Sequence, residues 1–124
     1  MSEIRATTIS DAAGTGPITL TKQSAAKAWV HWDGTGTVAI YESFGVSGLV
    51  DNDTGKYNIN MVSSMSSATY AITADSVAQS TAATYRTGSN YNTNTTSLFE
   101  MRTGASSGYV DVAHNSASVL GDLA

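Results

Sequence analysis

One short segment, Asp51-Asn52-Asp53-Thr54-Gly55, has two aspartates and a glycine at the spacing of a calcium-binding loop. A full loop of the EF-hand kind also supplies a distal glutamate and lies between two helices, and the sequence around this segment has neither. A tight turn, in which the acidic and amide side chains accept hydrogen bonds from backbone N–H groups, explains the same residues. The sequence favours the turn, with calcium binding as the alternative, and indicates no cofactor.

The two histidines, His31 and His114, and the 17 serines are the other groups that could take part in catalysis. A nucleophilic triad needs a serine, a histidine and an acid that converge in space, and so many serines make their mere presence uninformative. The chain has no cysteine, which excludes thiol catalysis, disulfides and zinc ribbons. Its ten acids are spread singly and mostly in turns, so the carboxylate pair of a glycan-cleaving enzyme is not indicated. We therefore expect no catalytic activity.

A polar loop over residues 89–96 surrounds one aromatic residue and has the side-chain chemistry of a sugar-binding site. Tyrosine offers a flat face for a sugar ring, and asparagine offers a paired donor and acceptor for hydroxyl groups. The residues that we expect to contact a glycan are Asn90, Tyr91, Asn92 and Asn94. An ordinary exposed loop is the alternative, because most loops have no binding role.

Composition indicates a β-rich protein whose surface is solvated mainly by hydroxyl and amide groups. The 124 residues include 17 serines and 17 threonines, while charged residues make up 13%, against an average of about 25%. Threonine favours strands and serine favours turns. The net charge of −4 and the scattered basic residues argue against binding to nucleic acid. Because no apolar run approaches the length of a membrane span, we expect no membrane contact, and we see no export signal at the N-terminus.

Alternating apolar and polar residues predict the short strands that would position these groups. The clearest alternation places Tyr57, Ile59 and Met61 on one face and amide side chains on the other. Residues 98–103 show the same alternation, with Phe99 on the apolar side. Seven or eight such strands, with turn signals between them, predict an all-β fold, a small antiparallel β-sandwich of jelly-roll-like kind.

We expect this β-sandwich to span residues 25–124, after a threonine-rich segment over residues 1–24. A Gly-Thr-Gly-Pro sequence in this segment contains the only proline of the chain and cannot be regular structure. The segment is therefore either a loose tail or an extended arm that docks on another subunit.

The strand expected over residues 28–32 is bulky on both faces. Such a strand is either buried on both sides or lies at a contact between subunits. The residues that we expect at a subunit contact are Trp29, His31 and Trp32.

The next strand is expected to return antiparallel after the hairpin turn that Asp33-Gly34 predicts. Its alternation indicates that Val38, Ile40 and Phe44 face the core. Glu42 interrupts this apolar face, which predicts a β-bulge nearby.

Two segments carry a more specific pattern: Gln23-Ser24-Ala25-Ala26-Lys27-Ala28-Trp29-Val30-His31-Trp32-Asp33-Gly34-Thr35-Gly36-Thr37, and Asp51-Asn52-Asp53-Thr54-Gly55-Lys56-Tyr57-Asn58-Ile59-Asn60-Met61 with Met65 and Tyr70 after it. They resemble a module of tailed-bacteriophage virion proteins, especially marine ones. Its members read Ala-Lys-Ala-Trp-Val-Asn-Phe-Asn-Gly-Thr-Gly-Thr and then Asp-Asn-Gly-Thr-Gly-Asp-Tyr-Thr-Val-Asn-Phe. The departures from this pattern are His31, Trp32, Asp33, Asp53 and Lys56.

The resemblance implies a structural protein located in a phage virion: a tail fibre, a head fibre or spike, or a capsid decoration protein. Many such proteins are trimers, so we expect a homotrimer whose 1–24 arm attaches it to other virion proteins. The resemblance supplies no catalytic residues. The alternative function is a carbohydrate-binding module that recognises host surface glycans, and the two are compatible because a fibre tip can bind a receptor.

Overall fold

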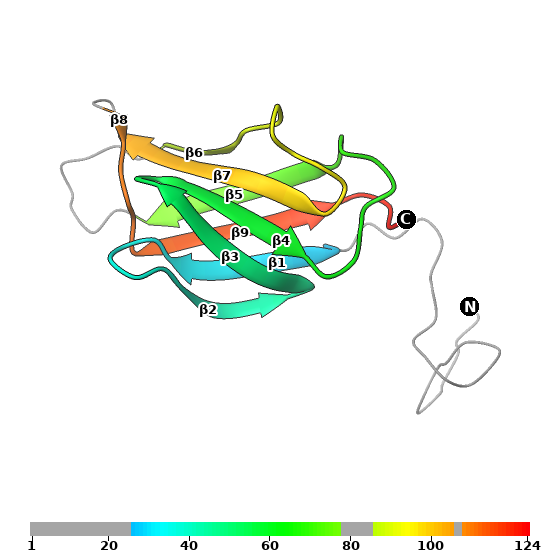
Figure 1. The fold of residues 1–124 in the computed structure, drawn as a ribbon, viewed down its shortest axis with the longest axis horizontal. Coiled ribbons are helices and arrows are strands. Elements are labelled where there is room, and N and C mark those ends of the chain that lie inside the picture. The colour runs from blue at the N-terminus through cyan, green and yellow to red at the C-terminus, as the bar shows by residue number, and fades with distance from the viewer. Residues whose placement is uncertain (1–25, 78–85, 106–107) are drawn as a thin grey trace, which may run out of the picture.

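The computed structural model describes residues 26–77, 86–105 and 108–124, and these residues form strands joined by turns and loops (Figure 1). The expected 1–24 arm lies outside the described residues. The strands of the described part are β1 (Ala28–Asp33), β2 (Ala39–Phe44), β3 (Val46–Asp53), β4 (Lys56–Met61), β5 (Ala71–Val77), β6 (Arg86–Ser89), β7 (Leu98–Ala105), β8 (Gly108–Tyr109) and β9 (His114–Leu120). Within these residues there is no helix that could cross a membrane.

The strands form two antiparallel sheets that pack face to face. The first sheet has the order β2-β1-β9-β5, and the second has the order β3-β4-β7-β6, with β8 paired to β7. Figure 1 shows β3, β4 and β7 of the second sheet in front of β1 and β9 of the first. The small antiparallel β-sandwich predicted from the sequence is therefore confirmed.

The core lies between the sheets and consists of the inward side chains of the central strands. Trp32, Tyr57, Ile59, Phe99 and Met101 are all fully buried there. The rings of Trp32 and Tyr57 meet edge to face, with their centroids 5.8 Å apart, a favourable geometry for aromatic pairs. The inward positions predicted for residues 57–61 and 98–103 are thus correct, because a period of two places alternate residues on one face.

A β-bulge interrupts the pairing of β1 with β2. His31 pairs with Glu42, but Trp32 pairs with Ile40, so that Tyr41 is the extra residue on β2. The bulge lies beside Glu42, where the sequence predicts it. A bulge of this kind moves the residues beyond it to the opposite face of the sheet.

The expectation that Phe44 faces the core is wrong. Phe44 pairs with Trp29 on the outer face, and 59% of its surface is exposed, because the bulge shifts the alternation along β2. Ile40 lies opposite Trp32 but is 37% exposed, since β2 is the edge strand of its sheet. Val38 packs against the core as expected.

The turns at one end of the sandwich are joined by Tyr57 and Asp111. The Tyr57 hydroxyl lies 2.8 Å from Asp111 Oδ1 and 3.1 Å from the carbonyl oxygen of Gly34. The same carboxylate oxygen accepts the N–H of Gly55 at 2.7 Å. Burial, and then the hydrogen bond to Asp111, raises the pKa of Tyr57. A Cβ on Gly34 would collide with the Tyr57 hydroxyl, so this junction requires a glycine there.

Candidate functional site

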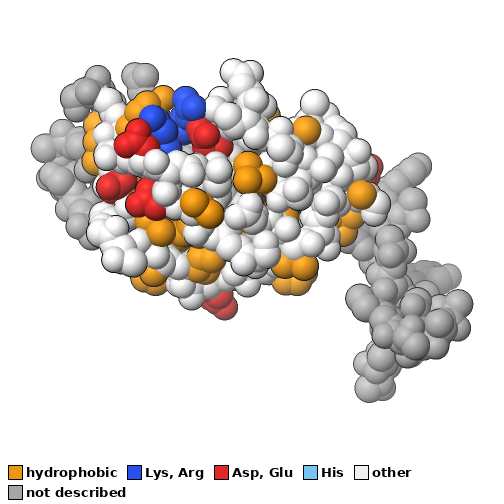
Figure 2. Space-filling model, viewed as in Figure 1, with side chains coloured by type: hydrophobic (Ala, Val, Ile, Leu, Met, Phe, Trp, Pro, Cys, Tyr) orange, Lys and Arg blue, Asp and Glu red, His pale blue; other side chains and the backbone are white. Residues whose placement is uncertain are grey.

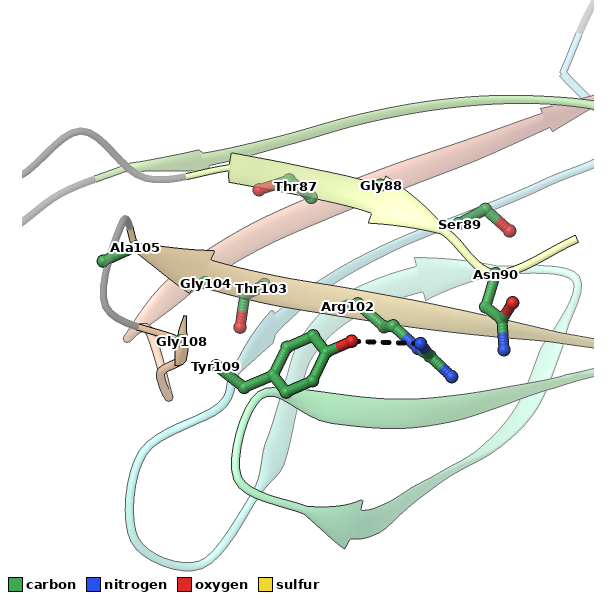
Figure 3. A pocket seen from close by; sticks show the side chains of 10 residues that line it. All are labelled: Thr87, Gly88, Ser89, Asn90, Arg102, Thr103, Gly104, Ala105, Gly108 and Tyr109. Atoms are coloured by element: carbon green, nitrogen blue, oxygen red, sulfur yellow. Dashed lines mark hydrogen bonds between the residues drawn. The ribbon is translucent and has the colours of Figure 1, made fainter.

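A groove with a volume of about 420 Å³ opens on the second sheet, over strands β6 and β7 and beside β8 (Figure 3). Its lining residues are Thr87, Gly88, Ser89, Asn90, Arg102, Thr103, Gly104, Ala105, Gly108 and Tyr109. Volumes of about 300–1,000 Å³ are typical of small-molecule sites. The groove is therefore the first candidate for a binding site.

Two strand glycines form part of the floor of the groove. Gly88 of β6 pairs with Arg102 of β7, and Gly104 of β7 pairs with Tyr109 of β8. The absence of side chains at the two glycines leaves a hollow beside the long side chains of their partners. A Cβ at Gly104 would lie 2.8 Å from the carbonyl oxygen of Gly108, whereas a Cβ at Gly88 would meet nothing within 4 Å. Gly104 thus permits close packing of β7 against β8, and Gly88 has no such role.

Arg102 is the centre of a polar network at the groove. Its Nε donates a hydrogen bond to Oε1 of Glu100, and its Nη1 donates to the Tyr109 hydroxyl at 3.0 Å. Nδ2 of Asn90 donates to the same Glu100 oxygen at 3.2 Å. Lys56 Nζ lies 5.0 Å from the centre of the Tyr109 ring, and Arg102 Cζ lies 5.6 Å from it, within the range of cation–π contacts. Both cations thus lie close to the phenol ring, which remains 47% exposed.

The charges at this site are paired with each other. Arg102 pairs with Glu100, and Lys56 Nζ lies 3.0 Å from Asp53 Oδ2. Burial opposes ionisation of Glu100, but the hydrogen bonds from Arg102 and Asn90 outweigh it and hold the pKa of the carboxyl below its usual value. Figure 2 shows basic and acidic side chains side by side on this face. The site offers hydrogen-bonding groups around an aromatic ring, with no net charge from the two pairs.

Of the turn expected over residues 51–55, only Thr54 and Gly55 form the tight turn between β3 and β4, because Asp51 to Asp53 are still part of β3. Asp53 Oδ1 accepts the N–H of Thr54 at 2.9 Å, and Gly55 has the positive φ of 64° that turns require. The hydrogen bond from Lys56, followed by that from Thr54, lowers the pKa of Asp53. Among the described residues, no three histidine, aspartate or glutamate side chains gather closely enough to hold a metal ion.

The four residues expected to contact a glycan lie between β6 and β7, but they do not form one site. Asn94 turns toward the protein, where its Oδ1 accepts the N–H of Glu100 at 3.1 Å. Tyr91 and Asn92 are exposed on the loop, with 57% of the Tyr91 surface accessible. Asn90 alone of the four lines the groove.

The outer face of the first sheet carries a cluster of rings, which we call the aromatic band: Trp29, His31, Tyr41, Phe44 and His114. The ring centroids of His31 and Tyr41 are 4.8 Å apart, and those of Tyr41 and His114 are 5.5 Å apart. Phe44 and Tyr41 are 59% and 49% exposed, respectively. The band therefore presents aromatic rings to the outside of the sandwich, with the exposed carboxylate Glu42 beside them, opposite His31.

The residues expected at a subunit contact are divided between this band and the core. Trp29 and His31 project from β1 into the aromatic band, where they are half-buried. Trp32 projects to the other side of β1 and is 0% exposed. Its side chain is therefore part of the core and cannot contact a second copy in this fold.

Of the residues that line the groove, sequence reasoning proposed only Asn90, and among those it missed are Gly88, Arg102 and Tyr109. The alternation of residues 98–103 does place Arg102 on the polar side, which is the only signal that the sequence contains. The groove itself depends on which residues face each other across β6, β7 and β8, and that register involves separate segments of the chain.

Comparison of the chain with protein-family models, with curated proteins and with solved structures finds no match. Function must therefore be argued from the surfaces themselves. The two surfaces with distinct chemistry are the glycine-floored groove on the second sheet and the aromatic band on the first.

Proposed function

We propose that this protein is a non-catalytic structural component of a bacteriophage virion, such as a fibre, spike or capsid decoration protein, that associates with copies of itself. The aromatic band is the observation that carries the proposal, because it provides a surface for self-association. The resemblance of residues 23–37 and 51–61 to virion modules supports the location in a phage particle.

The band is unusual for the solvated face of an antiparallel sheet. Such sheets normally alternate between apolar residues that face the core and polar residues that face water. Strand β1 instead places Trp32 in the core and Trp29 on the opposite face, where it pairs with Phe44. Exposed aromatic side chains that gather in this way mark sites of protein contact, and burying their apolar surface contributes about 25 cal/mol per Å².

The position of the band at a sheet edge favours contact between copies. Strand β2 ends the first sheet, so one side of its backbone has no neighbouring strand in the described part of the chain. Exposed edge strands readily approach another chain. Three copies related by a closed rotation would bury all their bands equivalently, and residues 1–24 would then connect the trimer to other virion proteins.

Measurement of the solution mass tests the proposal. The full-length protein should have three times its 12.8 kDa chain mass when light scattering is measured behind a sizing column. The double variant Trp29→Ser, Phe44→Ser should become monomeric, because it removes the apolar centre of the band. Val50→Ser is the matched control, since Val50 is 47% exposed on the second sheet and its loss should leave the trimer intact.

A monomeric wild-type protein at all concentrations would overturn self-association, and so would a trimer that the double variant does not weaken. Deletion of residues 1–24 tests whether this arm is needed for the trimer to form. A trimer that persists without the arm places the contact in the β-sandwich, whereas a trimer that is lost with the arm rules out the band as the main contact.

A further inference from the structure

We propose that the groove over Gly88 binds a neutral pyranose ring of a glycan. The groove lies on the second sheet, away from the aromatic band, so the proposal does not depend on self-association. It differs from the expectation of a glycan contact through the exposed tip of the 89–96 loop, because it places the sugar on the sheet beside that loop.

The first argument is that nothing in the described part of the fold requires a glycine at position 88. Gly88 lies in strand β6, has no positive φ, and a Cβ there would meet no atom within 4 Å. Glycine in a strand weakens it by about 0.5–1 kcal/mol relative to alanine. A strand glycine often marks a place where a ligand approaches the backbone closely. The missing side chain keeps the floor of the groove open for such a ligand.

The second argument is the choice of polar groups around this floor. In the described part of the chain, Arg102 uses its Nε for Glu100 and one N–H of Nη1 for Tyr109, so both N–H groups of Nη2 stay available. Asn90 donates to Oε1 of Glu100, and its own Oδ1 can accept a further hydrogen bond. Figure 3 shows Asn90, Arg102 and Tyr109 along one side of the groove, with Gly88 above them in this view, on β6. Adjacent sugar hydroxyls both donate and accept, and these planar groups match them.

The third argument concerns the charge of the ligand. The two cations whose side chains the structure describes at the site each have a carboxylate partner: Glu100 for Arg102 and Asp53 for Lys56. An acidic sugar would gain little attraction from Arg102 and would be repelled by Glu100, whose pKa is held low. A neutral ring avoids this repulsion and can pack its apolar face on Tyr109, which is 47% exposed. Neutral hexoses fit the site better than uronic or sialic acids.

A glycan array that displays both neutral and acidic structures is the test, with the full-length protein as the probe. We expect binding to one or more neutral hexose-containing glycans, which titration calorimetry then quantifies. Gly88→Val should weaken that binding at least tenfold, because the added side chain fills the floor. Gly48→Val is the matched control: it places the same side chain on β3 of the same sheet, where a Cβ would have only an ordinary contact at 3.8 Å.

Thermal unfolding and the oligomer mass of each variant separate blocked binding from damage to the fold. Tyr109→Ser is a second test variant, since it removes the ring without altering the glycine floor. It should also reduce the affinity for the neutral glycan at least tenfold. Binding to acidic glycans alone would overturn the proposal, as would no binding to any neutral glycan. Full affinity in a folded Gly88→Val protein would place the sugar elsewhere. None of these results depends on whether the protein is a trimer.

Discussion

Aromatic rings cluster on the β1–β2 side of one outer face of the sandwich, while charged and amide side chains cover the other outer face. The aromatic band has few polar contacts, and rings such as Phe44 are open to water. At the groove, by contrast, Arg102, Glu100 and Asn90 are joined by hydrogen bonds above a glycine floor. Both sheets pack against the same core, so core packing does not explain why their outer faces differ. The difference indicates two kinds of contact, one broad and apolar, the other narrow and polar.

The largest expected difference between the core and the outer face is on β1, which carries one tryptophan on each side. Trp32→Ala should lower the free energy of unfolding by about 3–5 kcal/mol, because it leaves a cavity in the core. Trp29→Ala should cost the monomer less than about 1 kcal/mol, since this side chain contributes to the outer face. Urea unfolding at low protein concentration measures both. Equal losses would show that the band is as important to the fold as the core.

Two glycines should respond differently to substitution by alanine: Gly34 lies in the packed junction at Tyr57, and Gly88 lies in the open groove. Gly34→Ala should lower the free energy of unfolding by about 1–3 kcal/mol, because its Cβ would collide with the Tyr57 hydroxyl. Gly88→Ala should leave stability unchanged or raise it by up to about 1 kcal/mol, because a strand gains from a side chain where space is free. Thermal unfolding of the two variants checks this. A destabilised Gly88→Ala protein would mean that the groove floor is needed for folding.

The stability of the protein at alkaline pH tests whether the Tyr70 hydroxyl holds the loop between β6 and β7. The Tyr70 hydroxyl lies 2.9 Å from the carbonyl oxygen of Thr95 and 2.8 Å from that of Leu98, and burial raises the pKa of Tyr70 to about 12. Because this pKa exceeds the unfolded value of about 10, the contribution to stability is complete below pH 10 and is lost as the pH rises toward 12. Tyr70→Phe should cost about 1 kcal/mol at pH 7 and flatten this dependence.

Urea midpoints between pH 8 and pH 12 give the measurement for Tyr70. Tyr109→Phe is the control, because Tyr109 lies exposed on the groove and its hydroxyl does not hold the loop. An unchanged alkaline dependence in Tyr70→Phe would assign the effect to other buried groups.

The smallest effect is expected at acid pH, where Glu100 of the charged face becomes protonated. Because the folded pKa of Glu100 lies below its usual value of about 4.5, its contribution to stability is present above pH 4.5 and is lost as the pH falls below that value. Glu100→Gln should reduce the acid sensitivity by less than about 1 kcal/mol. Phe44→Ser, on the aromatic band, should leave the acid dependence of the monomer as it is. Urea unfolding between pH 3 and pH 7 distinguishes the two.

The parts of the fold that depend on local alternation can be predicted from the sequence. Tyr57, Ile59 and Met61 face inward as their spacing requires, and Gly55 lies at a turn, whereas Gly34 lies in a longer loop between β1 and β2. Phe44 could not be placed correctly, since the bulge at Tyr41 reverses the face on which it lies. A bulge adds one residue to a strand and so reverses the face of every residue after it. The alternation of residue types in the sequence does not show at which residue this reversal occurs.

The candidate sites were harder to predict than the core, for a related reason. Asn90 and Asn94 look alike in the sequence, but one lines the groove and the other bonds to the N–H of Glu100. Gly88 and Arg102 become neighbours only through the pairing of β6 with β7. Pairing between strands is fixed by the whole sandwich, whereas propensity and alternation describe one strand at a time.

The placement of the two tryptophans on opposite sides of β1 has an optical consequence. Trp32 is buried 5.8 Å from the Tyr57 ring, so its fluorescence should be blue-shifted and shielded from acrylamide until the protein unfolds. Trp29 is half-buried on the band, so quenching of its emission should report whether another chain covers it. Since the chain contains no other tryptophan, single Trp→Phe variants would separate the two signals. Folding and assembly can thus be followed in the same cuvette without an attached dye.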